Sequence, residues 1–291
     1  MSQYRGPTKM RLWILSDLHV ELTRGWDLPS GDARPNFDVL VVAGDLVPRM
    51  ERGVRWLLER VPDKPVVYVP GNHEFYGTDI DRTVEKAMEA AEGTKVFVLQ
   101  DRWIKLGGVI FAGATLWTDF ALFGDEHRAM TVAADQMNDY RKIRVGRYVE
   151  RFRPPHALLR HRKSRTFLEG ELRKPRGTGR LVVITHHAPM PSWGNLVAPP
   201  YTGAELTDDD VLAAAYRSDL TSLMWPALIM DGQSYRRRPA DLWIYGHTHE
   251  TEDLTIGHTR IVSNAKGYGP WLPKYHAWDN QRFDPNLIVE V

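Results

Sequence analysis

Five short apolar runs, each followed by a cluster of polar residues, constrain the fold of this chain more than any other feature of its sequence. The runs are rich in Val, Ile and Leu, and they do not alternate between apolar and polar positions. Such runs are typical of strands buried on both faces of a sheet. Polar residues directly after such strands lie where open α/β sheets bind ligands. The five runs are residues 12–15, 39–43, 66–69, 181–184 and 242–245.

The clusters after these runs are rich in side chains that bind metal ions. In chain order they are Ser16-Asp17-Leu18-His19, Gly44-Asp45, Pro70-Gly71-Asn72-His73-Glu74, Thr185-His186-His187 and Gly246-His247-Thr248-His249. Six of the 11 histidines of the chain fall within them. A single Asp-x-His or Gly-Asp is more often structural than functional. Five strand-terminal clusters together indicate one site.

The segments between the runs predict a layered α/β fold. Helix formers or amphipathic spacing predict helices at 51–60, 79–91 and 157–172. Further strands are expected at 96–99, 103–106, 109–112, 261–263 and 287–291. Because one site would draw on residues from 17 to 249, and no segment reads as a linker, we expect a single domain over residues 1–291.

The composition limits the chemistry of such a site. The chain has no cysteine, which excludes thiolate zinc sites, iron–sulfur clusters and a cysteine nucleophile. Imidazoles and carboxylates without thiolates suit divalent Mn, Fe, Zn or Ni. The ligands are too many for one ordinary ion. Two divalent metal ions about 3.5–4 Å apart, sharing a carboxylate, would use them all.

The ordered motifs Asp17-Leu18-His19, Gly44-Asp45, Gly71-Asn72-His73-Glu74, His186 and Gly246-His247-Thr248-His249 resemble the calcineurin-like metallophosphoesterase signature. The resemblance implies a four-layer α/β/β/α sandwich of two facing mixed β-sheets flanked by helices. It implies that one metal ion is held by Asp17, His19, Asp45 and His249, and a second by Asp45, Asn72, His186 and His247. His73 matches the catalytic histidine of the family.

The resemblance implies hydrolysis of a phosphomonoester or phosphodiester. Two dications lower the pKa of a bridging water, so that a hydroxide nucleophile forms near neutral pH. His73 would hydrogen-bond the phosphoryl group or protonate the leaving oxygen. The expected partner is a small phosphate ester. A nuclease acting on DNA or RNA is the alternative, and a catalytically silent protein-binding scaffold is less favoured because every ligand and His73 are present.

Several residues near the motifs have less certain roles. For His187 we expect packing or support of a ligand, and for Glu74 we expect orientation of His73 or capping of the next segment. The polar residues Asn138-Asp139-Tyr140 suggest a contact with the site, without a mechanism. Trp193 and Tyr201, in the Pro-rich loop 188–203, either stack on a substrate or pack in the fold.

The charge of the chain is unevenly distributed. The formal net charge is +1, but residues 141–180 hold 14 basic and three acidic residues, a local net of +11 that leaves −10 on the rest. This segment suggests either a nucleic-acid contact or a solvated helix face paired with acids elsewhere. No apolar stretch is long enough for a signal peptide or a membrane span, so we expect a cytoplasmic protein without a membrane partner.

Overall fold

The apolar runs form strands in two sheets that face each other. The computed structural model describes residues 9–192, 206–230, 234–270 and 277–291. One sheet has the strand order β15-β1-β2-β3-β4 and the other β13-β14-β12-β9-β6-β5. The strands of the first are β1 (Arg11–Leu15), β2 (Val39–Val42), β3 (Val66–Tyr68), β4 (Val96–Val98) and β15 (Ile288–Glu290). Those of the second are β5 (Arg102–Leu106), β6 (Val109–Ala114), β9 (Arg180–Thr185), β12 (Leu242–Tyr245), β13 (Thr251–Ile256) and β14 (Thr259–Asn264).

Both sheets are mixed, and their central strands are parallel. β1 to β4 run parallel, with β15 antiparallel at the edge. In the second sheet β6, β9, β12 and β14 are parallel, and β5 and β13 are antiparallel edges. An isolated bridge between Ser16 and Ala265 joins the ends of β1 and β14. The carboxyl ends of parallel strands from both sheets therefore meet at one edge of the sandwich.

Apolar side chains fill the space between the two sheets. Between the sheets lie the buried side chains of Ile14 and Val41 from one sheet and Phe111, Val182 and Ile244 from the other. Each run thus buries both of its faces, as expected from its lack of alternation.

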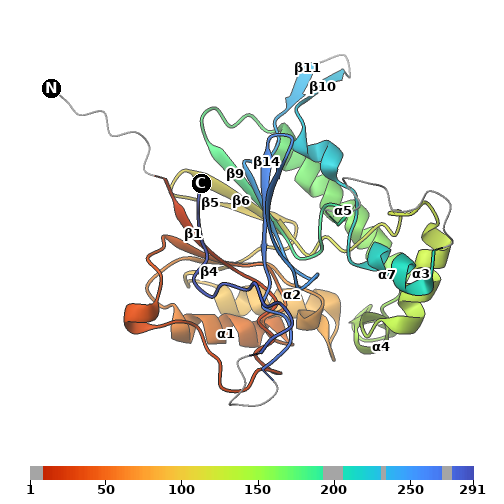
Figure 1. Cartoon of the computed structure of the whole chain (residues 1–291), viewed down its shortest axis with the longest axis horizontal. Helices are drawn as coiled ribbons and strands as arrows, with labels where there is room; N and C mark the ends of the chain where they lie inside the picture. Colours follow the sequence, from red (N-terminus) through yellow and green to blue (C-terminus); the bar gives the residue numbers. More distant parts are fainter. Residues whose placement is uncertain (1–8, 193–205, 231–233, 271–276) are drawn as a thin grey trace.

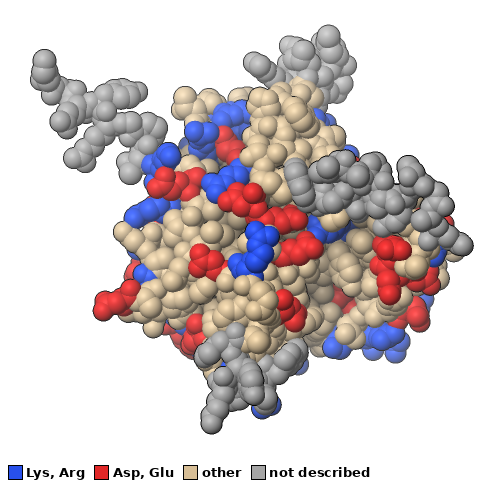
Figure 2. Space-filling model, in the orientation of Figure 1, with Lys and Arg blue, Asp and Glu red and all other residues tan. Residues whose placement is uncertain are grey.

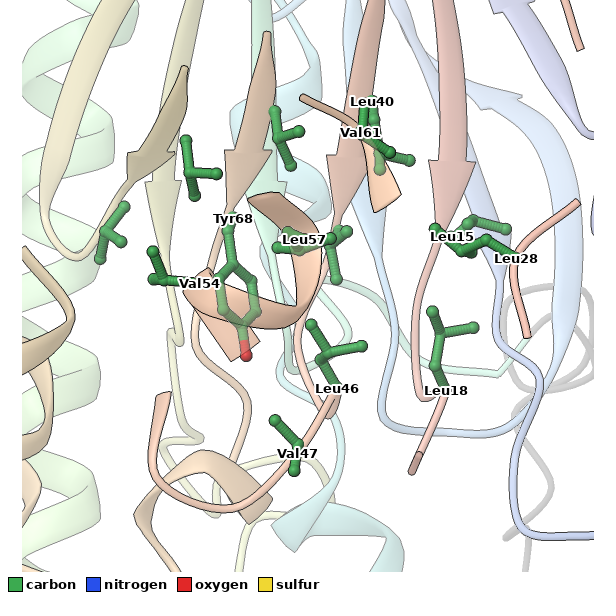
Figure 3. Close-up of a cluster of buried hydrophobic side chains, with 14 of the residues drawn as sticks. Leu15, Leu18, Leu28, Leu40, Leu46, Val47, Val54, Leu57, Val61 and Tyr68 are labelled. Atoms are coloured by element: carbon green, nitrogen blue, oxygen red, sulfur yellow. The ribbon is translucent and has the colours of Figure 1, made fainter. Parts of the chain in front are cut away.

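The outer faces of the sheets are covered by helices (Figure 1). α1 (Met50–Arg60) and α2 (Ile80–Ala91) cover the first sheet, and α5 (Pro154–Arg173) packs on the second. Figure 3 shows Val54 and Leu57 of α1 beside Tyr68 of β3. The order helix, sheet, sheet, helix confirms the predicted α/β/β/α sandwich.

The three predicted helices are present, with bounds that follow local chemistry. The Asp79 carboxylate accepts hydrogen bonds from the backbone N–H groups of Asp81 and Arg82 and caps α2. α5 begins at Pro154, earlier than the prediction of residue 157, because proline is well tolerated in the first turn of a helix.

Other elements were not predicted from the sequence. They are α3 (Glu126–Gln136), α4 (Asp139–Lys142), strand β13, and the hairpins β7 (Arg144–Val145) with β8 (Glu150–Arg151) and β10 (Ala227–Met230) with β11 (Ser234–Arg237). α7 (Asp208–Leu212) begins with three consecutive aspartates, and Thr207 is its capping residue. Short 3-10 turns occur at Gly31–Ala33, His73–Phe75, Ala213–Ala215 and Thr221–Met224.

Residues 154–173 of the basic segment form α5, and several basic side chains of this helix pair with acids. Arg160 pairs with Asp81, Lys163 with Asp101, and both Arg165 and Arg173 with Glu169. Figure 2 shows basic and acidic side chains interspersed over one face of the molecule. On α5 these pairs agree with the predicted helix face paired with acids, and the nucleic-acid contact stays a prediction. In the described ranges, no helix is long and apolar enough to cross a membrane.

Candidate metal centre

Asp45 lies between two groups of potential metal ligands at the shared edge of the sheets. Its Oδ2 atom is 3.8 Å from Nε2 of His19, and its Oδ1 atom is 3.4 Å from Nε2 of His186. The two carboxylate oxygens therefore face different groups. This is the arrangement that a bridging carboxylate requires.

The first group comes from the ends of β1 and β12. The Nε2 atoms of His19 and His249 are 3.3 Å apart, and Nε2 of His249 is 3.6 Å from Oδ1 of Asp17. The side chains of Asp17 and His19 are fully buried. Three ligand-type atoms thus lie within 4.8 Å of one another, and Oδ2 of Asp45 is 3.8 Å from the one on His19.

The second group centres on His186, at the end of β9. Its Nε2 atom lies 2.9 Å from Oδ1 of Asn72 and 3.1 Å from Nδ1 of His247. Its other ring nitrogen, Nδ1, is 2.9 Å from the carbonyl oxygen of Ala43, which fixes the ring across the two sheets. The structure therefore brings together all seven residues expected as ligands.

This donor set fits divalent cations. Nε2 of His186 faces Asn72 Oδ1, His247 Nδ1 and Asp45 Oδ1, whereas one proton on that nitrogen could satisfy a single acceptor. A cation between these atoms would satisfy all of them at once. Three groups of Asp and His side chains in the described part of the chain have ligand atoms within 4.8 Å of one another, and Asp45 belongs to two of them.

Strained backbone accompanies the ligands. Asp17, His19, Asp45, His247 and His249 all have positive φ, between 43° and 70°. Non-glycine residues mostly avoid this region, so tertiary contacts must hold the backbone of these five residues in it.

Glycines make room for the ligand side chains. A Cβ atom on Gly71 would overlap Oδ1 of Asp45 and lie 2.7 Å from Cε1 of His186, and one on Gly44 would overlap Nδ1 of His186. Only glycine fits at these positions because the backbone passes directly against the ligands. This explains physically why glycine precedes the ligands Asp45 and Asn72.

Asp139 orients Asn72, and the sequence suggested its contact with the site without giving its role. Its Oδ1 atom accepts hydrogen bonds from Nδ2 of Asn72 at 2.8 Å and from the hydroxyl of Tyr76 at 2.7 Å. Because Nδ2 is held by Asp139, the amide oxygen of Asn72 must face His186. Burial raises the pKa of Asp139.

Glu74 holds the turn that carries Asp45, and the prediction that it orients His73 or caps the next segment is wrong. The buried carboxylate accepts hydrogen bonds from the backbone N–H groups of Asp45, Leu46 and Gly71 at 2.7–2.9 Å, and from the Tyr68 hydroxyl at 2.7 Å. Burial raises the pKa of Glu74 to about 7. The N–H groups that donate to Glu74 lie in the turns after β2 and β3, and the sequence alone does not show that these turns meet at Glu74.

His73 lies beside the ligand groups with a partner at each ring nitrogen. Nδ1 is 3.4 Å from Oε1 of Glu21, and Nε2 is 3.2 Å from the hydroxyl of Tyr268. Burial lowers the pKa of His73, but the charges of Asp45 and Glu21 outweigh this and leave it raised. The ligand-type atoms of His73, His19 and Asp45 also lie within 4.8 Å of one another, so the catalytic role of His73 stays a prediction.

Two carboxylates that support site histidines were missed by sequence reasoning. Glu21 contacts His73, and Oδ2 of Asp279 is 3.0 Å from Nδ1 of His249. Neither belongs to a motif. Glu21 follows His19 by two positions, which gives a weak signal, whereas Asp279 is brought to His249 by the tertiary fold alone.

The charged groups of the site shift one another's pKa. Burial opposes ionisation of Asp45, but the neighbouring His186, His73 and His19 hold its pKa well below its usual range. Burial likewise opposes the charge on His186, yet Asp45 raises its pKa to about 10. Burial, followed by the nearby His187 and His186, keeps the pKa of His247 well below normal.

His187 packs behind the second group, as expected. Its ring centroid lies 4.2 Å from that of His247 and 5.1 Å from that of Trp117. Burial, together with the charge of His186, lowers the pKa of His187 well below its usual value. A neutral imidazole stacked on a ligand ring limits the movement of that ring.

A cavity of about 420 Å³ opens onto the ligand groups. Its walls include Asp45, His73, Tyr76, Asp139, Tyr216, Arg217, His247, His249, Glu250 and Tyr268. This volume suits a small molecule. Trp193 and Tyr201, expected in the loop after His186, lie outside the described residues.

The fold and this site define a metal-dependent phosphoester hydrolase. The family model for calcineurin-like phosphoesterases matches residues 10–251, and the chain belongs to that family. The named resemblance is thereby confirmed.

Two further comparisons match nearly the whole length of this chain. An uncharacterized protein from Acanthamoeba polyphaga mimivirus is 24% identical over 308 residues, which cover 96% of each chain. The crystal structure of phosphopantetheinyl hydrolase from Mycobacterium tuberculosis has a TM-score of 0.60 at 15% identity, covering 98% of this chain and 97% of that one. At this identity the structural match supports the fold.

Proposed function

We propose that this protein is a two-metal phosphoesterase in which Asp45 bridges the two ions. Asp17, His19, Asp45 and His249 hold one ion, and Asp45, Asn72, His186 and His247 hold the other. The observation that carries the proposal is the division of the Asp45 carboxylate, whose two oxygens face His19 and His186 separately. The ions are divalent Mn, Fe, Zn or Ni, since the donors are nitrogen and oxygen.

The pair of ions would supply charge neutralisation for the phosphate and an acidified water as nucleophile. The chain itself orients the ester through His73. The Glu21 carboxylate holds Nδ1 of His73, so Nε2 faces the cavity side, where it can donate a proton or a hydrogen bond to a phosphoryl or leaving-group oxygen. Asp139 and Asp279 keep Asn72 and His249 in the orientations that ligation requires.

The substrate we propose is a small phosphomonoester or phosphodiester. The cavity volume of about 420 Å³ supports a small substrate. A nuclease is not favoured, because the basic residues of α5 pair with acids such as Asp81, Asp101 and Glu169. A silent scaffold is not favoured, because all seven ligands converge.

Substitution of the bridging residue tests the proposal. Apo protein is titrated calorimetrically with Mn²⁺, and hydrolysis of an aryl phosphomonoester and an aryl phosphodiester is then measured with each candidate metal. We expect two ions per wild-type chain. For Asp45→Asn we expect loss of at least one ion and a loss of activity on the order of 10³-fold.

A matched pair of histidine variants separates ligation from general loss of an imidazole. His247→Asn removes a proposed ligand, whereas His258→Asn removes an exposed histidine on the turn between β13 and β14. We expect the first to lose activity and the second to retain it. One ion per wild-type chain, or full activity in Asp45→Asn, would refute the two-metal arrangement.

A further inference from the structure

Tyr268 lies over the first ligand group, outside every motif. Its ring centroid is 4.5 Å from that of His19, 4.8 Å from that of His249 and 5.9 Å from that of His73. The same side chain lines the cavity. One aromatic ring thus contacts two proposed ligands and the proposed catalytic histidine while facing the substrate space.

The hydroxyl of Tyr268 meets the nitrogen of His73 that would act on substrate. It lies 3.2 Å from Nε2 of His73, while Nδ1 of the same ring faces the Glu21 carboxylate. A carboxylate accepts hydrogen bonds, so Glu21 favours a proton on Nδ1. The phenol hydroxyl therefore lies beside Nε2, at the edge of the ring next to the cavity.

The backbone around Tyr268 is fixed by bonds to the site itself. The buried ammonium of Lys266 donates to the carbonyl oxygens of Gly267 at 2.8 Å and Gly269 at 2.6 Å. The N–H of Tyr268 donates to Oδ2 of Asp279 at 2.9 Å, the same oxygen that faces Nδ1 of His249. The position of the phenol is therefore tied to the position of a proposed ligand.

We propose that Tyr268 is a catalytic residue whose hydroxyl donates a hydrogen bond to the phosphoryl group of the substrate, beside His73. This inference rests on the proposed function. The phenol oxygen and Nε2 of His73 are 3.2 Å apart, so one phosphoryl oxygen can lie within hydrogen-bond distance of both, and the phenol can turn its O–H from Nε2 to that oxygen. No bond to Tyr268 forms or breaks, and its hydrogen bond strengthens as charge develops on the phosphoryl oxygens.

Tyr268→Phe removes the hydroxyl and keeps the ring over His19 and His249. We expect kcat for an aryl phosphate to fall about 10- to 100-fold, with Mn²⁺ binding unchanged, and the Kd for orthophosphate to rise at least about threefold. Tyr245→Phe is the matched control, because it also removes a largely buried tyrosine hydroxyl, one that contacts Glu252 outside the cavity. We expect this control to hydrolyse the ester at the wild-type rate.

A double-mutant cycle with His73→Asn separates direct contact from action through His73. If the hydroxyl touches the phosphoryl group, Tyr268→Phe weakens orthophosphate binding in the His73→Asn background as well. An effect that vanishes in that background would overturn the inference and make Tyr268 a positioning residue. Loss of Mn²⁺ binding in Tyr268→Phe, or unchanged activity, would also overturn it.

The same experiment keeps the two proposals apart. Wild-type protein that binds Mn²⁺ but hydrolyses no aryl ester would refute the proposed function, and the orthophosphate titrations would still decide the contact of Tyr268. Active wild-type protein with an equally active Tyr268→Phe variant would refute the role of Tyr268 alone.

Discussion

Asp139→Ala should uncouple Asn72 from the second ligand group. In the structure Nδ2 of Asn72 donates to the Asp139 carboxylate at 2.8 Å and to the Tyr76 hydroxyl at 3.2 Å. The carboxylate can only accept, so this bond distinguishes the nitrogen from the oxygen of a nearly symmetric amide. Without it, the amide can turn its nitrogen, which is no metal ligand, toward His186. The hydroxyl of Tyr76 loses its acceptor in the same variant.

The size of the effect follows from the lost bond. A buried hydrogen bond to a carboxyl group contributes about 1–3 kcal/mol, and each 1.4 kcal/mol is a factor of about ten in an equilibrium constant. We therefore expect Asp139→Ala to weaken the second ion by about 5- to 150-fold, in the range known for residues that orient metal ligands. The first ion, held by groups that Asp139 does not touch, should bind normally.

The assay is a calorimetric titration of apo protein with Mn²⁺, which resolves the two binding steps. Asp139→Asn is the matched control, because its Oδ1 can still accept from both Asn72 and Tyr76. We expect this variant to bind within about threefold of wild type. Equal losses in both variants, or a normal second ion in Asp139→Ala, would show that orientation of Asn72 is not the function of Asp139.

Three further predictions concern the backbone, the core and pH. Gly71→Ala should abolish binding of the second ion in an Mn²⁺ titration, because the added Cβ would overlap the Asp45 carboxylate. In the control Gly170→Ala in α5, the added Cβ meets no atom within 4 Å, so we expect normal folding by circular dichroism and normal Mn²⁺ binding. Leu57→Ala should lower the free energy of unfolding in urea by about 2–5 kcal/mol, since Leu57 is fully buried against the first sheet, and the exposed Leu159→Ala should cost under about 0.5 kcal/mol. Burial lowers the pKa of Lys266 from 10.5 to about 8, so between these pH values the unfolded chain binds more protons than the folded protein. The free energy of unfolding of wild type, measured in urea titrations, should therefore rise relative to that of Lys266→Met by on the order of 2–3 kcal/mol from pH 7.5 to 10. A stability difference between these two proteins that falls or stays constant over that pH range would contradict the buried ammonium.

Local pattern in the sequence predicted the strands of the two facing sheets except β13, the helices α1, α2 and α5, and the residues that we propose as ligands. The runs ending at Leu15, Val42, Tyr68, Thr185 and Tyr245 bury both faces, and this requirement leaves its mark as unbroken apolar sequence. Ligand types are equally visible, because a metal site needs carboxylates and imidazoles where parallel strands end. β13 was missed because it is a partly exposed edge strand without an unbroken apolar run, and α3 was missed although Asp125 caps its first turn.

The tertiary structure decided which atoms of these residues meet and what holds them. Glu74 accepts hydrogen bonds from turns after two different strands, and no spacing in the sequence encodes that convergence. Asp139 and Asp279 reach Asn72 and His249 across 67 and 30 positions. Such contacts depend on three-dimensional distance alone, so the sequence determined which residues we propose as ligands, and only the fold determined how their side chains are oriented.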